Sequence, residues 1–291
     1  MNIPNKTLTN GFSIPVFGLG TWEMGGRMER DEQNNDHADI QAIKNAIDSG
    51  VTLIDTAEAY ADGYSEELLA EAIKNYDRSK LFIISKIARV NQQYEQVKKS
   101  CKASLKRLKL NYLNLYLLHA PSLDTPIEET MRAIDELVDE GLIKNIGVSN
   151  FTVKQLQRAQ KATRNKIVVC QNHYNLIVRE SENSVLKYCQ ENDIIFMAWR
   201  PLEKGAVLEQ GKAVLKKMAE EYQKTPAQVA INWLISQKNV VAISKMRNPK
   251  HLQNNLEAIG WEMSQEDIEY LRNNFPGKLN VSPTVPLKEW R

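Results

Sequence analysis

Short apolar runs alternate with longer amphipathic stretches along most of the chain. Eight runs rich in Val, Ile and Leu have the length and composition of buried β-strands. They are Phe17–Gly20, Val51–Asp55, Leu81–Lys86, Leu113–His119, Ile143–Val148, Ile167–Gln171, Ile194–Trp199 and Val240–Ser244. Helical periodicity fills several of the intervals, at Tyr94–Leu108, Pro126–Glu140, Val153–Ala162 and Glu182–Glu191. A further helix is predicted to begin at Pro226, with Thr225 as its N-cap, and to run to about Gln237.

Eight strand–helix units of this spacing predict an α/β fold, a closed parallel (β/α)8 TIM barrel. Ahead of the first strand, Lys6–Val16 alternates in polarity around Asn10-Gly11, which is typical of a β-hairpin. We expect this hairpin to cover one end of the barrel. The chain shows no linker-like tract between the strand–helix units, so residues 1–291 are predicted to form a single domain.

Composition and charge limit the classes of molecule that the protein is expected to bind and the compartment in which it is expected to lie. Lys and Arg number 38 against 36 Asp and Glu, which leaves a formal charge of +2 and gives no bulk electrostatic case for nucleic acid or anionic membrane. No apolar run is long enough for a transmembrane helix, and the first nine residues are polar. The three cysteines show no CxxC spacing, so we expect no disulfide framework and a cytoplasmic location.

Polar residues gather at the predicted carboxyl ends of three consecutive strands. Asp55, Lys86 and His119 each end a strand-like run, and Tyr60 follows Asp55 after five residues. In a parallel barrel these strand ends share one face, where functional groups lie. Each residue alone has a structural explanation, such as a helix cap or a core histidine. Lys86 nevertheless needs a partner, because an unpaired buried ammonium is costly, and Asp55 on the adjacent strand is the expected one.

These four residue types suit proton transfer to a carbonyl oxygen. A free tyrosine titrates at about pH 10, and we expect Lys86 to lower the pKa of Tyr60 and make it a general acid. Asp55 would keep Lys86 charged and oriented, and a neutral His119 would orient the carbonyl. Side chains cannot supply hydride, so this chemistry implies a nicotinamide cofactor.

The cofactor is expected at the ends of the later strands, since neither GxGxxG nor GxxxxGK[ST] occurs as a phosphate-binding motif. Asn248 can cap a helix that begins at Pro249, whose free N–H groups would lie beside Lys245 and Arg247. This basic segment extends to His251 and predicts an anion site. A solvated basic helix start is the alternative.

Other strand ends could hold the nicotinamide. Trp199 offers a flat apolar surface on which the ring could stack, although a single tryptophan is more often part of a core. Ser149, Asn150 and Gln171 offer hydrogen-bond donors and acceptors suited to a carboxamide.

These residues and their order resemble the aldo-keto reductase family over nearly the whole chain. The matching pieces are Gly18-Leu19-Gly20-Thr21-Trp22, Leu53-Ile54-Asp55-Thr56-Ala57, Tyr60, Ser85-Lys86, Leu117-Leu118-His119, Gly147-Val148-Ser149-Asn150-Phe151, Gln171, Trp199-Arg200-Pro201-Leu202 and Lys245–Asn255. The resemblance implies a catalytic tetrad of Asp55, Tyr60, Lys86 and His119, and NADPH more often than NADH as cofactor, used without a metal.

Together with the residues above, the resemblance implies a set of cofactor contacts at the strand ends and in the following loops. The set comprises Gly20, Thr21, Trp22, Asp55, Ser149, Asn150, Gln171, Trp199, Arg200, Pro201, Leu202, Lys204, Gly205, Ile243, Ser244, Lys245, Arg247, Asn248, His251, Asn254 and Asn255. Within the family, the pattern is most similar to short prokaryotic aldehyde reductases, such as 2,5-diketo-gluconate or methylglyoxal reductases.

The chain also departs from the family pattern. Trp199 stands where Tyr or Phe is common, which should preserve stacking. Met246 and His251 replace a usual serine and arginine, and Asn254 replaces a usual glutamate, so NADH use stays open beside NADPH. His119 is followed by Ala120-Pro121 where many members have tryptophan, and the tail after Phe275 is short.

These departures predict a roomy substrate pocket for a small carbonyl compound, lined by Trp22, Met24, Tyr60 and His119. The leading hypothesis is NADPH-dependent reduction of small aldehydes (2-oxoaldehydes, glyceraldehyde or sugar aldehydes) by a monomer. One alternative is a Schiff-base aldolase that uses Lys86, although an ion pair with Asp55 would keep that lysine protonated. The other is a non-catalytic, NADPH-binding regulatory subunit.

Overall fold

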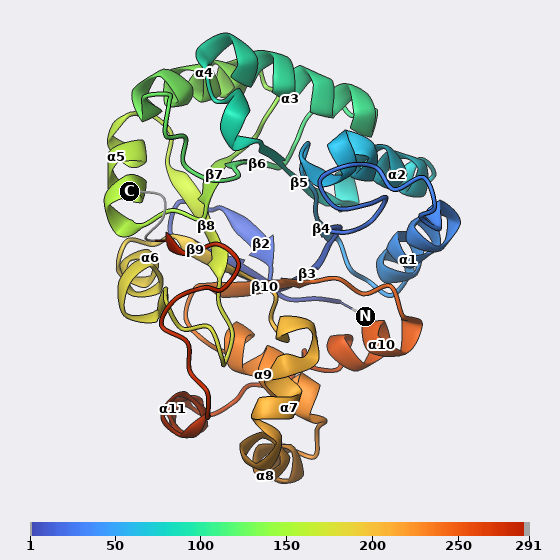
Figure 1. Ribbon diagram of the computed structural model, residues 1–291, viewed down its shortest axis with the longest axis vertical. Helices are drawn as coiled ribbons and strands as arrows, with labels where there is room; N and C mark the ends of the chain where they lie inside the picture. Colours follow the sequence, from blue (N-terminus) through green and yellow to red (C-terminus); the bar gives the residue numbers. More distant parts are fainter. Residues whose placement is uncertain (1, 288–291) are drawn as a thin grey trace.

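The computed structural model describes residues 2–287 and shows a closed, eight-stranded parallel barrel surrounded by helices (Figure 1). Around the barrel the strand order is β10-β3-β4-β5-β6-β7-β8-β9, so every strand pairs with its neighbours in the chain and the last closes on the first. The strands are β3 (Phe17–Gly20), β4 (Leu53–Asp55), β5 (Phe82–Ile87), β6 (Leu115–Leu118), β7 (Ile146–Ser149), β8 (Ile167–His173), β9 (Ile195–Trp199) and β10 (Val240–Ser244). All eight predicted strands are confirmed, with small changes at their ends.

Helices follow the strands and cover the outside of the barrel. They are α1 (Asp36–Asp48), α2 (Tyr64–Ile73), α3 (Tyr94–Leu108), α4 (Ile127–Asp139), α5 (Val153–Lys161), α6 (Lys187–Glu191), α7 (Ala206–Gln210), α8 (Lys212–Tyr222), α9 (Pro226–Ile235), α10 (Pro249–Leu256) and α11 (Gln265–Asn274). The predicted helix over Glu182–Glu191 is only half α-helical, because its first turn, Glu182–Leu186, has π-helical hydrogen bonding. The start of α9 is as predicted: Thr225 accepts from the backbone N–H of Gln228, and the Gln228 side chain accepts in return.

The N-terminal hairpin closes the amino end of the barrel. Strands β1 (Asn5–Thr7) and β2 (Ser13–Pro15) pair antiparallel, and Gly11 has a φ of +86°, which suits glycine in the turn. Leu8, Phe12 and Ile14 are buried in one apolar cluster with residues near the starts of the barrel strands, among them Leu53, Phe82, Leu115, Val168, Ile195 and Val241. The predicted covering role is therefore confirmed, and the opposite, carboxyl end of the barrel is left for the functional groups.

A second, larger apolar cluster fills the space between the strands and the helices. Inside the barrel, adjacent strands approach closely at Gly18 of β3. A side chain on Gly18 would place its Cβ 2.5 Å from Cγ of Leu53, so this position requires glycine. Cys101, Cys170 and Cys189 are buried and free, as expected. No helix within residues 2–287 is long and apolar enough to cross a membrane.

Candidate active site

The four predicted catalytic residues meet at the carboxyl end of the barrel. Asp55 is the last residue of β4, Lys86 lies near the end of the paired strand β5, and His119 directly follows β6. Tyr60 begins a 3-10 turn, Tyr60–Gly63, that returns the loop after β4 toward Lys86. Three neighbouring parallel strands therefore bring together residues that are separated by up to 64 positions in the sequence.

Lys86 is the centre of the cluster. Its ammonium donates hydrogen bonds to Oδ2 of Asp55 at 2.6 Å, to the carbonyl of Thr56 at 2.9 Å and to Oη of Tyr60 at 2.9 Å, which uses all three of its protons. The side chain of Lys86 is fully buried. Burial lowers the pKa of Lys86, but the Asp55 carboxylate and Tyr60 raise it by more, so the net shift is upward and the ammonium stays charged.

The electrostatics of Tyr60 differ from the sequence prediction. We expected Lys86 to give Tyr60 a lowered pKa, but burial of the phenol raises the pKa by more than the neighbouring ammonium lowers it, and Asp55 raises it further. The prediction of a lowered pKa is therefore wrong for the net shift. Tyr60 is a neutral phenol at neutral pH, and because its oxygen accepts from Lys86, its own proton is free for another acceptor.

Two aromatic rings flank Tyr60. The Trp22 ring lies edge-on at 4.9 Å between centroids, and the His119 ring at 5.5 Å. Burial and the nearby charge of Lys86 lower the pKa of His119 to about 3, so the imidazole is neutral at physiological pH, as expected. Met24, by contrast, was expected to line the substrate pocket, but its side chain is fully buried in the large apolar cluster outside the barrel. Met24 therefore presents no surface to a substrate.

Two polar residues at the ends of β7 and β8, Asn150 and Gln171, are bonded directly to the tetrad. Gln171 donates from Nε2 to Oδ1 of Asp55 at 3.0 Å. Asn150, in the left-handed region with a φ of 61°, donates from Nδ2 to the carbonyl of His119 at 2.9 Å and to Oγ of Ser149 at 3.0 Å. The residues expected to bind a carboxamide therefore adjoin the tetrad.

Trp199 ends β9 and is only partly buried. One face of its indole is covered by His173 at the end of β8, with ring centroids 4.0 Å apart and planes 14° from parallel. His173 is absent from the sequence prediction, because nothing in the local pattern distinguishes it from a residue at the edge of a strand. The loop that follows Trp199 carries the remaining predicted contacts of this region: Arg200, Pro201, Leu202, Lys204 and Gly205.

The basic segment after β10 does open a helix, but two of its cations, Lys245 and Arg247, are ion-paired. Asn248 caps α10 by accepting from the backbone N–H of Lys250 at 2.9 Å, and Pro249 is the first helical residue. Lys245 contacts Glu23 at 2.5 Å, and Lys204 contacts the same carboxylate at 3.0 Å. Glu23 lies in the loop after β3, so one carboxylate links the loops that follow β3, β9 and β10. These bonds outweigh partial burial and lower the pKa of Glu23 to about 2.

Arg247 is held more firmly than the sequence indicates. Its guanidinium bonds both oxygens of the buried Asp39 in α1, with Nη2 2.8 Å from Oδ2. The same nitrogen donates to the carbonyl of Glu23 at 2.6 Å and to Oδ1 of Asn34 at 3.2 Å. The phosphate contact of Arg247 stays a prediction; in the structure its guanidinium ties the start of α10 to α1.

The other predicted cofactor residues lie around the same end of the barrel. Gly20 and Thr21 end and follow β3, and Ile243 and Ser244 end β10 beside them. His251 is exposed on α10. Asn254 bonds Thr225 and Gln228 at the start of α9, and Asn255 is buried.

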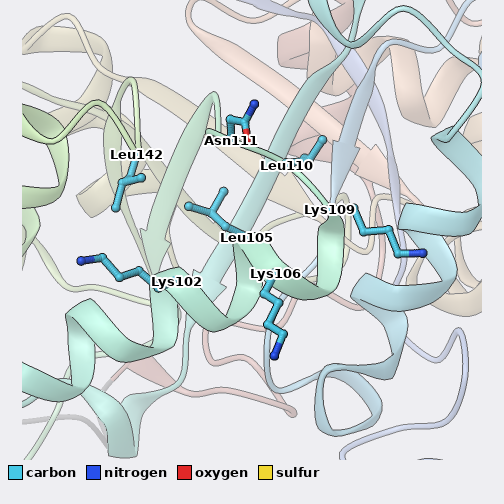
Figure 2. Close-up of a pocket in the computed structure, with 7 residues that line it drawn as sticks. All are labelled: Lys102, Leu105, Lys106, Lys109, Leu110, Asn111 and Leu142. Carbon is cyan, nitrogen blue, oxygen red and sulfur yellow. The ribbon is translucent and has the colours of Figure 1, made fainter.

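A surface hollow of about 590 Å³ lies elsewhere, against the last turns of α3 (Figure 2). It is lined by Lys102, Leu105, Lys106, Lys109, Leu110, Asn111 and Leu142. Leu110 and Leu142 precede β6 and β7 in the chain, which places the hollow toward the amino ends of the strands. It therefore does not contain the tetrad.

Residues 16–274 match the aldo/keto reductase family. The chain belongs to this family. A methylglyoxal reductase of Escherichia coli (strain K12) is 35% identical over 91% of this chain and 92% of its own length. A glyoxal reductase of Bacillus subtilis (strain 168) is 35% identical over 90% of this chain and 89% of its own length. Membership of this family makes the chain an NAD(P)H-dependent oxidoreductase.

Solved aldo/keto reductase structures share the fold. The thermostable aldo-keto reductase Tm1743, crystallised with the inhibitor epalrestat, superimposes with a TM-score of 0.88 at 38% identity, and covers 92% of this chain and 98% of that one. An aldo-keto reductase from Klebsiella pneumoniae, crystallised with NADPH, gives a TM-score of 0.83 at 32% identity, and covers 95% and 96% of the two chains.

Proposed function

We propose that this aldo/keto reductase uses NADPH to reduce small aldehydes, such as 2-oxoaldehydes, glyceraldehyde or sugar aldehydes, to alcohols. The observation that carries the proposal is the hydrogen bond from Lys86 to Oη of Tyr60. It occupies a lone pair of the phenol, leaves the phenolic proton available, and holds a positive charge where a phenolate would form. The methylglyoxal and glyoxal reductases among the relatives support the substrate class.

In this proposal Tyr60 is the proton donor. A nicotinamide, when bound, supplies hydride to the carbonyl carbon. Charge then develops on the carbonyl oxygen, and Tyr60 gives its proton to that oxygen, which is more basic than a phenolate. The raised pKa of Tyr60 keeps the phenol protonated until then. The resulting phenolate is stabilised by Lys86 at 2.9 Å, and Asp55 holds the ammonium in place.

His119 and Trp22 would position the substrate. With its pKa near 3, His119 is a neutral imidazole that can donate one hydrogen bond to the carbonyl oxygen without adding a second positive charge beside Lys86. Trp22 is partly exposed beside Tyr60 and offers an apolar wall. The tetrad contains a single acid with an available proton, which suits a one-proton reduction.

The residues present fit NADPH as the cofactor. Trp199 keeps part of its surface exposed for a nicotinamide ring, and Asn150 and Gln171 would hold the carboxamide. The N-terminus of α10, with Asn248 as cap and Lys245 beside it, would hold the phosphates. Arg247 is paired with the buried Asp39, whereas Lys245 is paired with the partly exposed Glu23, so Lys245 is the principal candidate for discriminating NADPH from NADH.

A Schiff-base aldolase requires a neutral Lys86 amine. The raised pKa of Lys86 and its three hydrogen bonds oppose that state, so the structure favours the reductase. A regulatory subunit that only binds NADPH remains the other alternative, and turnover tests it.

The test is a panel of aldehydes, ketones and sugars assayed with NADPH and with NADH, reported as kcat/KM, on the wild type and on Tyr60→Phe. We expect 2-oxoaldehydes and small hydroxyaldehydes with NADPH to give the highest values. Tyr60→Phe should lower kcat by about 10²–10⁴-fold, the usual contribution of general acid catalysis, and should leave NADPH affinity nearly unchanged. If Tyr60→Phe retains strong activity, the assignment of the proton donor is wrong. Tight NADPH binding by the wild type without turnover would favour the regulatory alternative.

A further inference from the structure

The stacked pair of His173 and Trp199 is not explained by the tetrad. The two residues are direct partners in the β8–β9 register, so their side chains lie on the same side of the sheet. Their rings are parallel to within 14° at 4.0 Å. His173 is only 3% exposed, whereas Trp199 is partly exposed. His173 therefore covers one face of the indole and is itself shielded from solvent.

Both ring nitrogens of His173 are bonded. Nε2 lies 2.5 Å from Oε2 of Glu203, and Nδ1 lies 2.7 Å from Oγ of Ser282. Burial lowers the pKa of His173 by more than Glu203 raises it, so the ring is neutral. A carboxylate only accepts, so the ring proton is on Nε2, and Nδ1 accepts from the Ser282 hydroxyl. The Ser282 oxygen in turn accepts from the backbone N–H groups of Thr284 at 3.3 Å and Val285 at 3.1 Å.

Glu203, in the loop after β9, is itself anchored. It accepts from Nδ2 of Asn175 at 3.0 Å and from Nη1 of Arg200 at 3.4 Å. Arg200 also donates to Oγ1 of Thr284 at 2.8 Å, and its guanidinium lies 5.5 Å from the centre of the Trp199 ring. The network therefore joins the end of β8, the loop after β9 and the C-terminal segment on one side of Trp199.

This arrangement constrains the indole more than stacking alone would. A phenylalanine at position 173 could stack equally well, but it could not bond Glu203 or Ser282. A histidine with both nitrogens bonded cannot rotate without breaking a buried hydrogen bond, and leaving such a group unpaired is costly. The plane of His173, and through it the plane of Trp199, is set by Glu203 and Ser282.

We propose that His173 is a positioning residue for the nicotinamide: held between Glu203 and Ser282, it fixes the plane of the Trp199 indole against which the nicotinamide ring stacks. The C-terminal segment is thereby coupled to the placement of the hydride donor. This inference rests on the proposed function, because it takes Trp199 as the nicotinamide platform.

The test compares two ligands that differ in the nicotinamide. Isothermal titration with NADPH and with adenosine 2′,5′-bisphosphate, which lacks that ring, is performed on the wild type, His173→Phe, Glu203→Ala and the double variant. We expect each single variant to weaken NADPH binding about three- to tenfold, the range of a displaced aromatic stack. Binding of the bisphosphate should stay within about twofold. The double variant should bind no more weakly than the weaker single variant, because both substitutions remove the same hydrogen bond, between His173 and Glu203.

A second measurement follows the hydride step. The single-turnover rate of NADPH oxidation should fall about tenfold in His173→Phe, a fraction of the ~10²-fold that a misplacement of about 1 Å costs. Glu203→Gln, which keeps an acceptor for Nε2, should recover at least half of the rate that Glu203→Ala loses. The matched control is Tyr174→Phe: Tyr174 is a fully buried neighbour whose hydroxyl donates to Glu182 at 2.8 Å, outside the network. It should lower thermal stability without changing either ligand's affinity or the hydride rate.

The free protein offers a readout that is independent of turnover. In ¹⁵N-histidine NMR spectra without ligand, His173 should show the Nε2–H tautomer, and Glu203→Ala should change its ring nitrogen shifts. Three results would overturn the inference: equal loss of affinity for both ligands, an effect in the double variant that is the product of the single effects, or a His173 ring protonated on Nδ1. Two results with the wild type would instead overturn the proposed function. One is an affinity for NADPH no higher than that for the bisphosphate, and the other is NADPH binding without turnover.

Discussion

Replacing Lys86 with methionine is the sharpest perturbation of the tetrad, because this side chain is fully buried and uses all three protons. Methionine fills a similar volume, so the change removes the charge with little change of packing. Asp55 would keep one side-chain donor, Gln171 at 3.0 Å, and would be left as a buried carboxylate without a cation. Breaking a buried ion pair from one side costs about 3–5 kcal/mol. In a chain of this size we expect Tm to fall by roughly 5–10 °C.

The effect on catalysis is larger than this stability loss. An ammonium 2.9 Å from a phenolate contributes about 6 kcal/mol of attraction at an effective dielectric constant of ~20, and the charge of Asp55 offsets part of it. We therefore expect Lys86→Met to lower kcat by about 10³-fold, which corresponds to ~4 kcal/mol. NADPH affinity should change by less than about twofold, because Lys86 has no exposed surface for a ligand.

The assay combines NADPH oxidation at saturating aldehyde, an NADPH titration and a thermal melt, all on the same preparation. Lys98→Met is the matched control: Lys98 is likewise ion-paired, with Glu136 at 2.7 Å and Glu140 at 3.3 Å, but it lies on the helical surface. It should change kcat and Tm little. A Lys86→Met enzyme that keeps more than about a tenth of wild-type kcat would refute the assignment of Lys86 as the group that stabilises the phenolate.

Three further outcomes are expected. Lys245→Ala should weaken NADPH about tenfold and NADH much less, since a charged hydrogen bond to the 2′-phosphate is lost; equal weakening of both would show that Lys245 does not contact that phosphate. Arg247→Ala should mainly lower Tm, because it leaves the buried Asp39 carboxylate without its cation, and calorimetry measures this. Unfolded histidine takes up a proton below pH 6.5, whereas His119 does so only at about pH 3. The free energy of unfolding should therefore fall as the pH drops from 6.5 to about 3. In His119→Gln the denaturant midpoint should depend less on pH across this window. An equally steep dependence in the variant would contradict a neutral His119 imidazole.

Most of the barrel was predictable because its signals are local. A buried parallel strand is apolar on both faces, so runs such as Phe82–Ile87 stand out from the amphipathic helices between them. The closing hairpin and the capping of α9 also follow from short-range residue preferences. The first turn of the Glu182–Glu191 helix was not predictable, since π-helical hydrogen bonding leaves no comparable mark in the sequence.

Some features of the candidate site could likewise be predicted from the sequence, and others could not. The meeting of Asp55, Lys86 and His119 follows from the rule that parallel strand ends share one face, which the sequence already contains once the barrel is recognised. The burial of Met24 and the pairing of Arg247 with Asp39 depend on contacts between segments far apart in the chain. No local pattern encodes them.

The sequence by itself determined the class of fold, the tetrad and the place of the basic segment, because these depend on residue type and spacing along the chain. The tertiary structure decided the protonation states of the site residues and the hydrogen-bond and ion-pair partners of the loops. The pKa of Tyr60 is raised because burial outweighs the charge of Lys86, and a balance of that kind exists only when both are placed in space. The Glu23 bridge to Lys204 and Lys245, and the bonds that hold His173 against Trp199, likewise arise from loops that meet only in the folded barrel.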